Sequence, residues 1–183
     1  METEKINIQE ALSLGYVYLL LIGLVTDNIF YSALGINIMN YSNFLDILTT
    51  PVNLLINNYI IPITLAFIGF FLYYFNKYKH QTKEKKTGIK TSKFEIHKKF
   101  VISMALLTFS FYVGLGWGMA SGASERLKKG EIKPSHEIIF NNGKQLKVKI
   151  IGQNSAYIFY VPENTNKVII TPITNTIFQI KKL

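Results

Sequence analysis

The hydrophobic positions of this sequence gather in three long runs. They occupy residues 12–25, 54–75 and 100–120. A run of 18 or more nearly uncharged residues is typical of a transmembrane helix, because about 20 residues with a rise of 1.5 Å cross a hydrocarbon core of about 30 Å. The pattern therefore predicts a membrane α-helical bundle with three spans, at about residues 11–34, 52–75 and 100–121.

The segment between the first two runs, residues 36–53, is too polar to span a membrane. Its apolar residues nevertheless recur at helical spacing, as Ile38, Tyr41, Leu45 and Leu48. This spacing predicts an amphipathic connector helix that lies in the membrane interface or packs on the bundle, and that Thr49-Thr50-Pro51 ends.

A proline, Pro62, lies inside the second apolar run. Proline removes one backbone hydrogen bond and clashes with the preceding helical turn, so a kink is expected near Asn58. Pro62 is accordingly a candidate gating hinge. The alternative is a purely structural proline, which is common in membrane helices.

From residue 136 onward the hydrophobic pattern changes to period two. Five β-rich runs alternate with turn residues such as Asn141-Asn142-Gly143 and Gly152-Gln153-Asn154, which predicts a small all-β domain with an antiparallel five-stranded meander. In layout it resembles an SH3-like or Sm-like barrel. We expect a transmembrane domain at 1–122, a linker at 123–135 and the β domain at 136–183. So small a domain is expected to need support from the helices or from identical neighbours.

Basic residues cluster beside the second and third apolar runs. Residues 77–99 contain nine lysines and two glutamates, which is typical of a solvated loop. Next to a bilayer such a loop attracts anionic headgroups, at roughly 1 kcal/mol per lysine near the surface. The lysines expected to contact headgroups are Lys77, Lys79, Lys83, Lys85 and Lys86. Nucleic acid is disfavoured as a partner, because no interleaved aromatic residues offer stacking platforms.

The distribution of Lys and Arg also predicts an orientation. Ten of them lie in the N-terminal segment and residues 77–99, against four near the other end of the third run, Arg126, Lys128, Lys129 and Lys133. The positive-inside rule places the side with more of these residues in the cytoplasm. We therefore expect a bacterial inner-membrane protein with its N-terminus and residues 77–99 in the cytoplasm and its β domain outside.

The third run contains small residues at helical spacing. Gly114, Gly118 and Gly122 share one helix face, and Gly116 and Ala120 share another. Glycine costs about 1 kcal/mol relative to alanine inside a helix, and in lipid it permits the close backbone approach on which helix association depends. The two faces predict two helix neighbours, one within the chain and one in another subunit. Packing within one chain is the alternative for both.

Four polar residues are expected within the first two spans. They are Asp27, Asn28, Asn57 and Asn58. An ionisable residue inside a membrane is by default a functional candidate. The alternative for Asp27 is a hydrated position close to the membrane interface.

The sequence offers little catalytic chemistry. It has no cysteine, and its three histidines lie in hydrophilic segments without a second ligand at metal-binding spacing. No phosphate-binding glycine loop follows a strand, and no G-x-S-x-G elbow occurs. We expect no enzymatic activity, no metal and no cofactor.

These features favour a small homo-oligomeric membrane protein whose glycine-faced helices form or control a membrane-permeabilising bundle governed by the β domain. In organisation the chain resembles the compact multi-span effectors of bacterial antiviral systems, such as retron-associated or cyclic-nucleotide-triggered membrane proteins. That resemblance implies a toxic pore in antiviral defence. The rival hypothesis is a non-conducting membrane anchor, whose β domain is a sensor or binds a protein partner through a strand edge. Ion-coupled transport centred on Asp27 needs more helices than one chain supplies.

Overall fold

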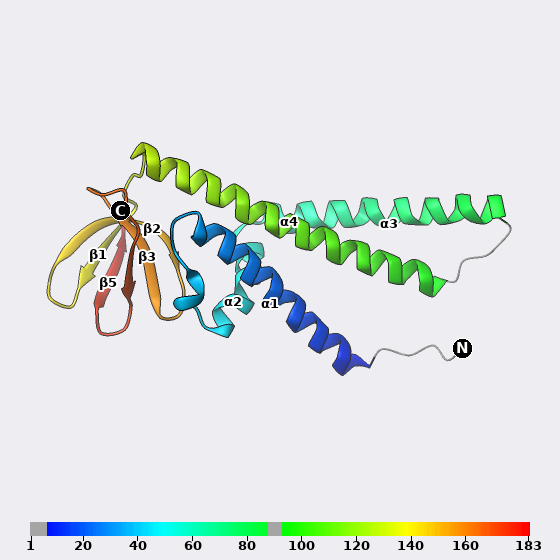
Figure 1. Cartoon of the computed structure of the whole chain (residues 1–183), viewed down its shortest axis with the longest axis horizontal. Helices are drawn as coiled ribbons and strands as arrows, with labels where there is room; N and C mark the ends of the chain where they lie inside the picture. The colour runs from blue at the N-terminus through cyan, green and yellow to red at the C-terminus, as the bar shows by residue number, and fades with distance from the viewer. Residues whose placement is uncertain (1–6, 88–92) are drawn as a thin grey trace.

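The chain folds into an elongated helical unit with a β-sheet at one end (Figure 1). The structure is a computed structural model and describes residues 7–87 and 93–183. The helices of this part are α1 (Ile8–Ser32), the 3₁₀ turn η1 (Ile38–Asn40), α2 (Phe44–Asn57), α3 (Ile60–Thr87) and α4 (Lys93–Lys129). Three segments, Ile8–Ser32, Ile60–Lys83 and Ile96–Lys129, are long and apolar enough to cross a membrane. The prediction of three spanning helices is confirmed, and the protein is of the multi-pass membrane class.

The long helices have their ends at two opposite sides of the molecule. The C-terminal ends of α1 and α4 lie near the sheet, whereas the N-terminal end of α1 and the C-terminal end of α3 lie far from it (Figure 1). With α1, α3 and α4 across a bilayer, the lysine-rich end of α3 and the sheet are therefore on opposite sides. This arrangement agrees with the expected separation of the two.

The connector helix α2 continues through the proline that was expected to end it. Proline at position 51 cannot donate to the Ile47 carbonyl, whose oxygen instead lies where a Cβ on Gly23 of α1 would be. The carbonyl of Pro51 itself accepts a hydrogen bond of 2.8 Å from the Tyr112 hydroxyl of α4. The prediction that Thr49-Thr50-Pro51 stops the helix is wrong, because contacts with α1 and α4 stabilise the proline-containing turn.

The chain breaks between α2 and α3 at Asn58. The Asn58 side chain accepts a hydrogen bond of 3.1 Å from the Ile60 amide, and its backbone carbonyl accepts one from Ile61. The expected kink near Asn58 is thus a complete break, and the second span begins at Ile60 rather than at residue 52. Pro62 lies in the first turn of α3, where a helix has unpaired amides in any case.

Two segments predicted as loop and linker are largely helical. Helix α3 extends to Thr87 and α4 begins at Lys93, so most of the expected loop at 77–99 is helix, with residues 88–92 outside the described part. Helix α4 also continues through most of the expected linker at 123–135, as far as Lys129. It ends where Gly130 adopts a positive φ of 67°, a conformation that glycine adopts without strain.

The sheet contains the five expected strands. They are β1 (His136–Phe140), β2 (Gln145–Gln153), β3 (Tyr157–Pro162), β4 (Ile169–Pro172) and β5 (Ile177–Lys182). All pairings are antiparallel, in the order β4-β3-β2-β1-β5. The sheet is therefore a meander whose last strand returns to pair with the first, and β4 and β5 are its outer strands.

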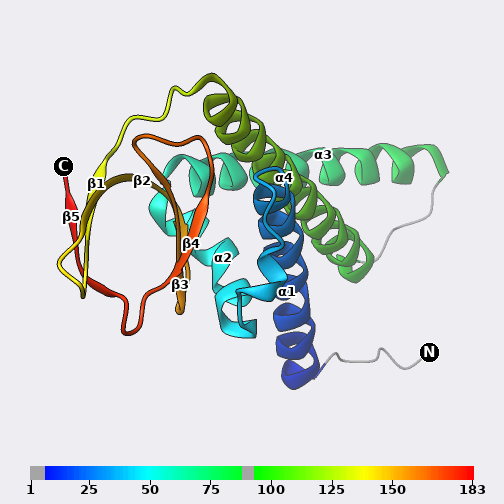
Figure 2. The same cartoon turned by 60° about the vertical axis from the view of Figure 1, so that its left-hand side comes forward.

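Strand β3 is buried on both faces. On one face Ile158 and Tyr160 pack with Val148 of β2 and Ile138 of β1. On the other face Phe159 packs against Tyr31 of α1, Ile36 of the following loop and Ile38 of η1. Figure 2 shows β3 and β4 on the side of the sheet that faces the helices, and β1 and β5 on the far side. The sheet is thus packed directly on the end of α1.

Candidate functional site

The two small-residue faces of α4 have different environments. Gly116 lies against α1, where an added Cβ would be 3.1 Å from the Thr26 carbonyl oxygen. Ala120, on the same face, is buried. This face is occupied by the close α1–α4 contact within one chain, as the sequence predicted for one of the two faces.

The other face of α4 has no neighbour among the residues that the structure describes. A Cβ added to Gly114, Gly118 or Gly122 would meet no atom within 4 Å. Gly114 and Gly118 form the floor of a shallow apolar hollow of about 500 Å³, with Phe111 and Met119 among its walls. We call the surface of Gly114, Gly118 and Gly122 the open glycine face.

Large apolar side chains elsewhere on α4 and α3 are also exposed. On α4, Leu106 and Trp117 are 65% and 68% exposed, and on α3 Phe67 is 72% exposed. In water such a surface would be an aggregation-prone patch, whereas in a bilayer it faces lipid or another helix. Helix α3 packs only lightly on α4, through contacts such as the edge-to-face pair of Tyr73 and Phe100.

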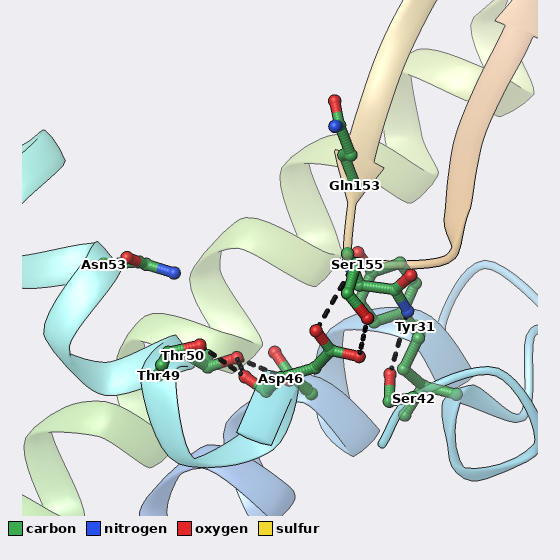
Figure 3. A pocket seen from close by; sticks show the side chains of 11 residues that line it. Tyr31, Ser42, Asp46, Thr49, Thr50, Asn53, Gln153 and Ser155 are labelled. Atoms are coloured by element: carbon green, nitrogen blue, oxygen red, sulfur yellow. Dashed lines mark hydrogen bonds between the residues drawn. The ribbon is translucent and has the colours of Figure 1, made fainter. Parts of the chain in front are cut away.

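A polar pocket of about 400 Å³ lies where α1, α2 and the β2–β3 turn meet (Figure 3). Asp27 and Asp46 both line it, together with Thr50. The Thr50 hydroxyl donates a hydrogen bond of 2.8 Å to the Asp27 carboxylate. Asp27 is therefore directed toward the α2 connector rather than toward lipid.

Asp46 joins α2 to the sheet. Its carboxylate accepts hydrogen bonds of 3.1 Å from the backbone amide and the hydroxyl of Ser155, in the β2–β3 turn (Figure 3). It also accepts one from the Asn43 amide, which completes the N-terminal capping box of α2. The Asn43 side chain donates to the Ser155 hydroxyl at 2.9 Å. We call Asn43, Asp46 and Ser155 the Asp46 junction.

The other predicted polar residues are not brought together with Asp27. Asn28 is exposed, on a different side of α1. Asn57 and Asn58 precede the second span, at the break between α2 and α3, so they are not inside a spanning helix. The sequence prediction missed this because it placed the start of the span before Asn57.

The lysines predicted to contact headgroups lie on the C-terminal part of α3. Lys77, Lys79, Lys83 and Lys85 have exposed side chains at the end of the molecule far from the sheet. Lys86 also belongs to α3, and its side chain is outside the described part. Their contact with lipid stays a prediction.

Several residues that position the site were not identified from the sequence. They are Gly23, Tyr112 and Ser155. Gly23 is the only glycine between Gly15 and Gly35 in the first run, which is a weak signal of helix crossing. Nothing in the sequence around Ser155 pointed to a contact with α2, apart from its place next to a predicted turn.

Among the described residues, no three of His, Asp or Glu lie close enough to hold a metal ion. No known family model matches the chain, and neither a curated protein nor a solved structure is significantly similar to it. The class of the protein therefore rests on its fold and surfaces alone. It is a multi-pass membrane protein with a C-terminal antiparallel sheet.

Proposed function

We propose that this protein assembles with copies of itself in the membrane, through the open glycine face of α4, into a bundle that forms or controls a permeation path. The open glycine face is the observation that supports the proposal. In lipid, helices associate mainly by van der Waals packing, which bare glycine backbone improves. Glycines inside a helix destabilise it, and within the described part of the chain nothing packs on this row to compensate; packing against a second helix would offset the cost.

The sheet is a suitable regulator for such a bundle. Phe159 contacts Tyr31 near the end of α1, and Ser155 is hydrogen-bonded to Asp46 of α2. A ligand or partner that moves the sheet would therefore act directly on these two helices. The biological setting that we propose is a toxic effector of bacterial antiviral defence, in which the sheet receives the trigger.

The test is membrane leakage in cells that express the protein. We expect dye entry with the wild type and none with the double variant Gly114→Ile, Gly118→Ile. Because a Cβ added at either position meets no atom of another element within 4 Å, we expect the substitutions to leave the fold of one chain intact. Gly15→Ile is the matched control, since Gly15 of α1 is also free of neighbours, and it should leak like the wild type.

Equal leakage of the wild type and the double variant would reject the open glycine face as the assembly surface. Intact membranes at high expression of the wild type would reject the permeation path. A crosslinking measurement of the oligomer in the same membranes separates loss of assembly from loss of conduction.

The alternative function is a non-conducting membrane anchor whose sheet binds a protein partner. The observation that favours it is the outer strand β5, on which Phe178 is 74% exposed. An unpaired strand edge with an exposed aromatic side chain can accept an added strand. Under this alternative, cells stay intact, and Phe178→Asp abolishes the activity of the complex without changing membrane insertion.

A further inference from the structure

A second groove lies between α1 and α4, on the sheet side of their contact at Gly116. Its volume is about 750 Å³, and residues of both helices line it. Ile29 comes from α1, and Val113, Trp117, Ser124 and Lys128 come from α4. We call it the α1–α4 groove.

The lining changes from apolar to polar along α4. Val113 and Trp117 are at the end toward the membrane centre, and Ser121, Ser124, Glu125 and Lys128 follow toward the end of the helix. From Val113 to Lys128 the helix rises by about 22 Å, which is half of a hydrocarbon core of about 30 Å plus part of the headgroup layer. From its apolar end to its polar end, the groove therefore matches one leaflet of a bilayer, from the acyl chains to the headgroups.

The polar end of the groove carries an available cation. Glu125 forms an ion pair with Lys129 at 2.6 Å, so its charge is balanced outside the groove. Arg126 lines a different hollow, together with Lys133 and Lys149. Lys128 therefore supplies the positive charge that a ligand in the groove would meet. The Ser121 and Ser124 hydroxyls make no hydrogen bond within the described part of the chain.

We propose that the α1–α4 groove binds one anionic phospholipid from the leaflet on the sheet side. An acyl chain lies against Val113 and Trp117, the phosphate is next to Lys128, and the serine hydroxyls donate to ester or phosphate oxygens. Charge complementarity selects the anionic lipid, and the change in polarity selects a lipid over a soluble phosphate. The inference depends on the membrane location of the helices and not on a permeation path.

The single tryptophan of the chain, Trp117, is in the groove and reports on its occupant. The full chain is reconstituted in phosphatidylcholine vesicles that contain a fixed fraction of chain-brominated lipid, either phosphatidylglycerol or phosphatidylcholine. Bromine quenches tryptophan fluorescence on contact. We expect brominated phosphatidylglycerol to quench Trp117 at about fivefold lower mole fraction, the preference that one lysine near the surface supplies.

Three variants test where the preference for the anionic lipid arises. Lys128→Gln should remove it, whereas Arg126→Gln, a matched charge loss one half-turn away on another face, should preserve it. Ser124→Phe fills the groove and should also reduce it. Equal quenching by the two brominated lipids in the wild type would overturn the proposal, as would an equal effect of Arg126→Gln and Lys128→Gln or an unchanged preference in Ser124→Phe.

Discussion

The ring of Tyr31 in α1 lies 4.9 Å from the ring of Phe159 in β3, measured between centroids. This contact joins a membrane-spanning helix to the sheet. The Tyr31 hydroxyl packs against Gly152 of β2, so a Cβ at position 152 would collide with the hydroxyl oxygen. Tyr41, which follows η1, adds an edge-to-face contact with Tyr157 at 5.3 Å. The sheet and the helices thus share one aromatic interface.

Truncation of Phe159 should separate the sheet from the helices. Phe159 has no exposed surface, and Phe→Ala changes at such positions cost about 3–5 kcal/mol of unfolding free energy. Chemical denaturation of the detergent-solubilised protein measures the loss. Phe178→Ala is the matched control, since Phe178 is 74% exposed, and it should change stability by less than about 0.5 kcal/mol. Similar losses for both variants would contradict the burial of Phe159 between α1 and the sheet.

The crossing of α1 and α2 should depend on Gly23. The Ile47 carbonyl occupies the space that a Cβ at Gly23 would need. Gly23→Ala should therefore destabilise the protein by about 1–3 kcal/mol, despite the better helix propensity of alanine. Gly15→Ala, on the same helix and without neighbours, should be neutral or slightly stabilising. Thermal unfolding in detergent compares them, and a neutral Gly23→Ala would show that the helices do not cross there.

The Asp46 junction can be measured by a double-mutant cycle. Asp46→Ala removes two hydrogen bonds to Ser155 and part of the α2 cap, whereas Ser155→Ala removes the hydroxyl bonds to Asp46 and Asn43 and keeps the bond from its backbone amide. Because the junction is accessible to solvent, we expect a coupling energy of about 0.5–1.5 kcal/mol between the two positions. Stability in denaturant supplies the four values. Additive losses would mean that the two residues do not interact in solution.

Labelling of introduced cysteines tests the orientation, because the chain has none of its own. Asn142→Cys lies in the turn after β1, and Lys85→Cys lies near the far end of α3. With the sheet outside, a membrane-impermeant thiol reagent should label Asn142→Cys in intact cells and Lys85→Cys only after permeabilisation. The reverse pattern would place the sheet in the cytoplasm and refute the orientation expected from the lysine distribution.

The local sequence was sufficient to predict a helix or a strand where a residue pattern is compatible with only one of the two. The three apolar runs had to be helices, since lipid offers no partner for unpaired backbone groups. The alternating runs after residue 135 became the five strands. The run around Phe159 lacks polar alternation, which agrees with a strand buried on both faces. The end predicted at Pro51 was wrong because contacts of that turn with α1 and α4 keep it helical, whereas the break at Asn58 rests on local hydrogen bonds to Ile60 and Ile61.

The sequence by itself determined that this protein lies in a membrane, with three helices and a small sheet, because hydrophobic period and length act over a few neighbouring residues. Only the tertiary structure decided which glycine face of α4 is used within the chain and which is open. Both faces have small residues at the same spacing, so the choice depends on where Thr26 of α1 lies. The same holds for Asp46, whose role as a link to Ser155 depends on a contact across more than a hundred residues.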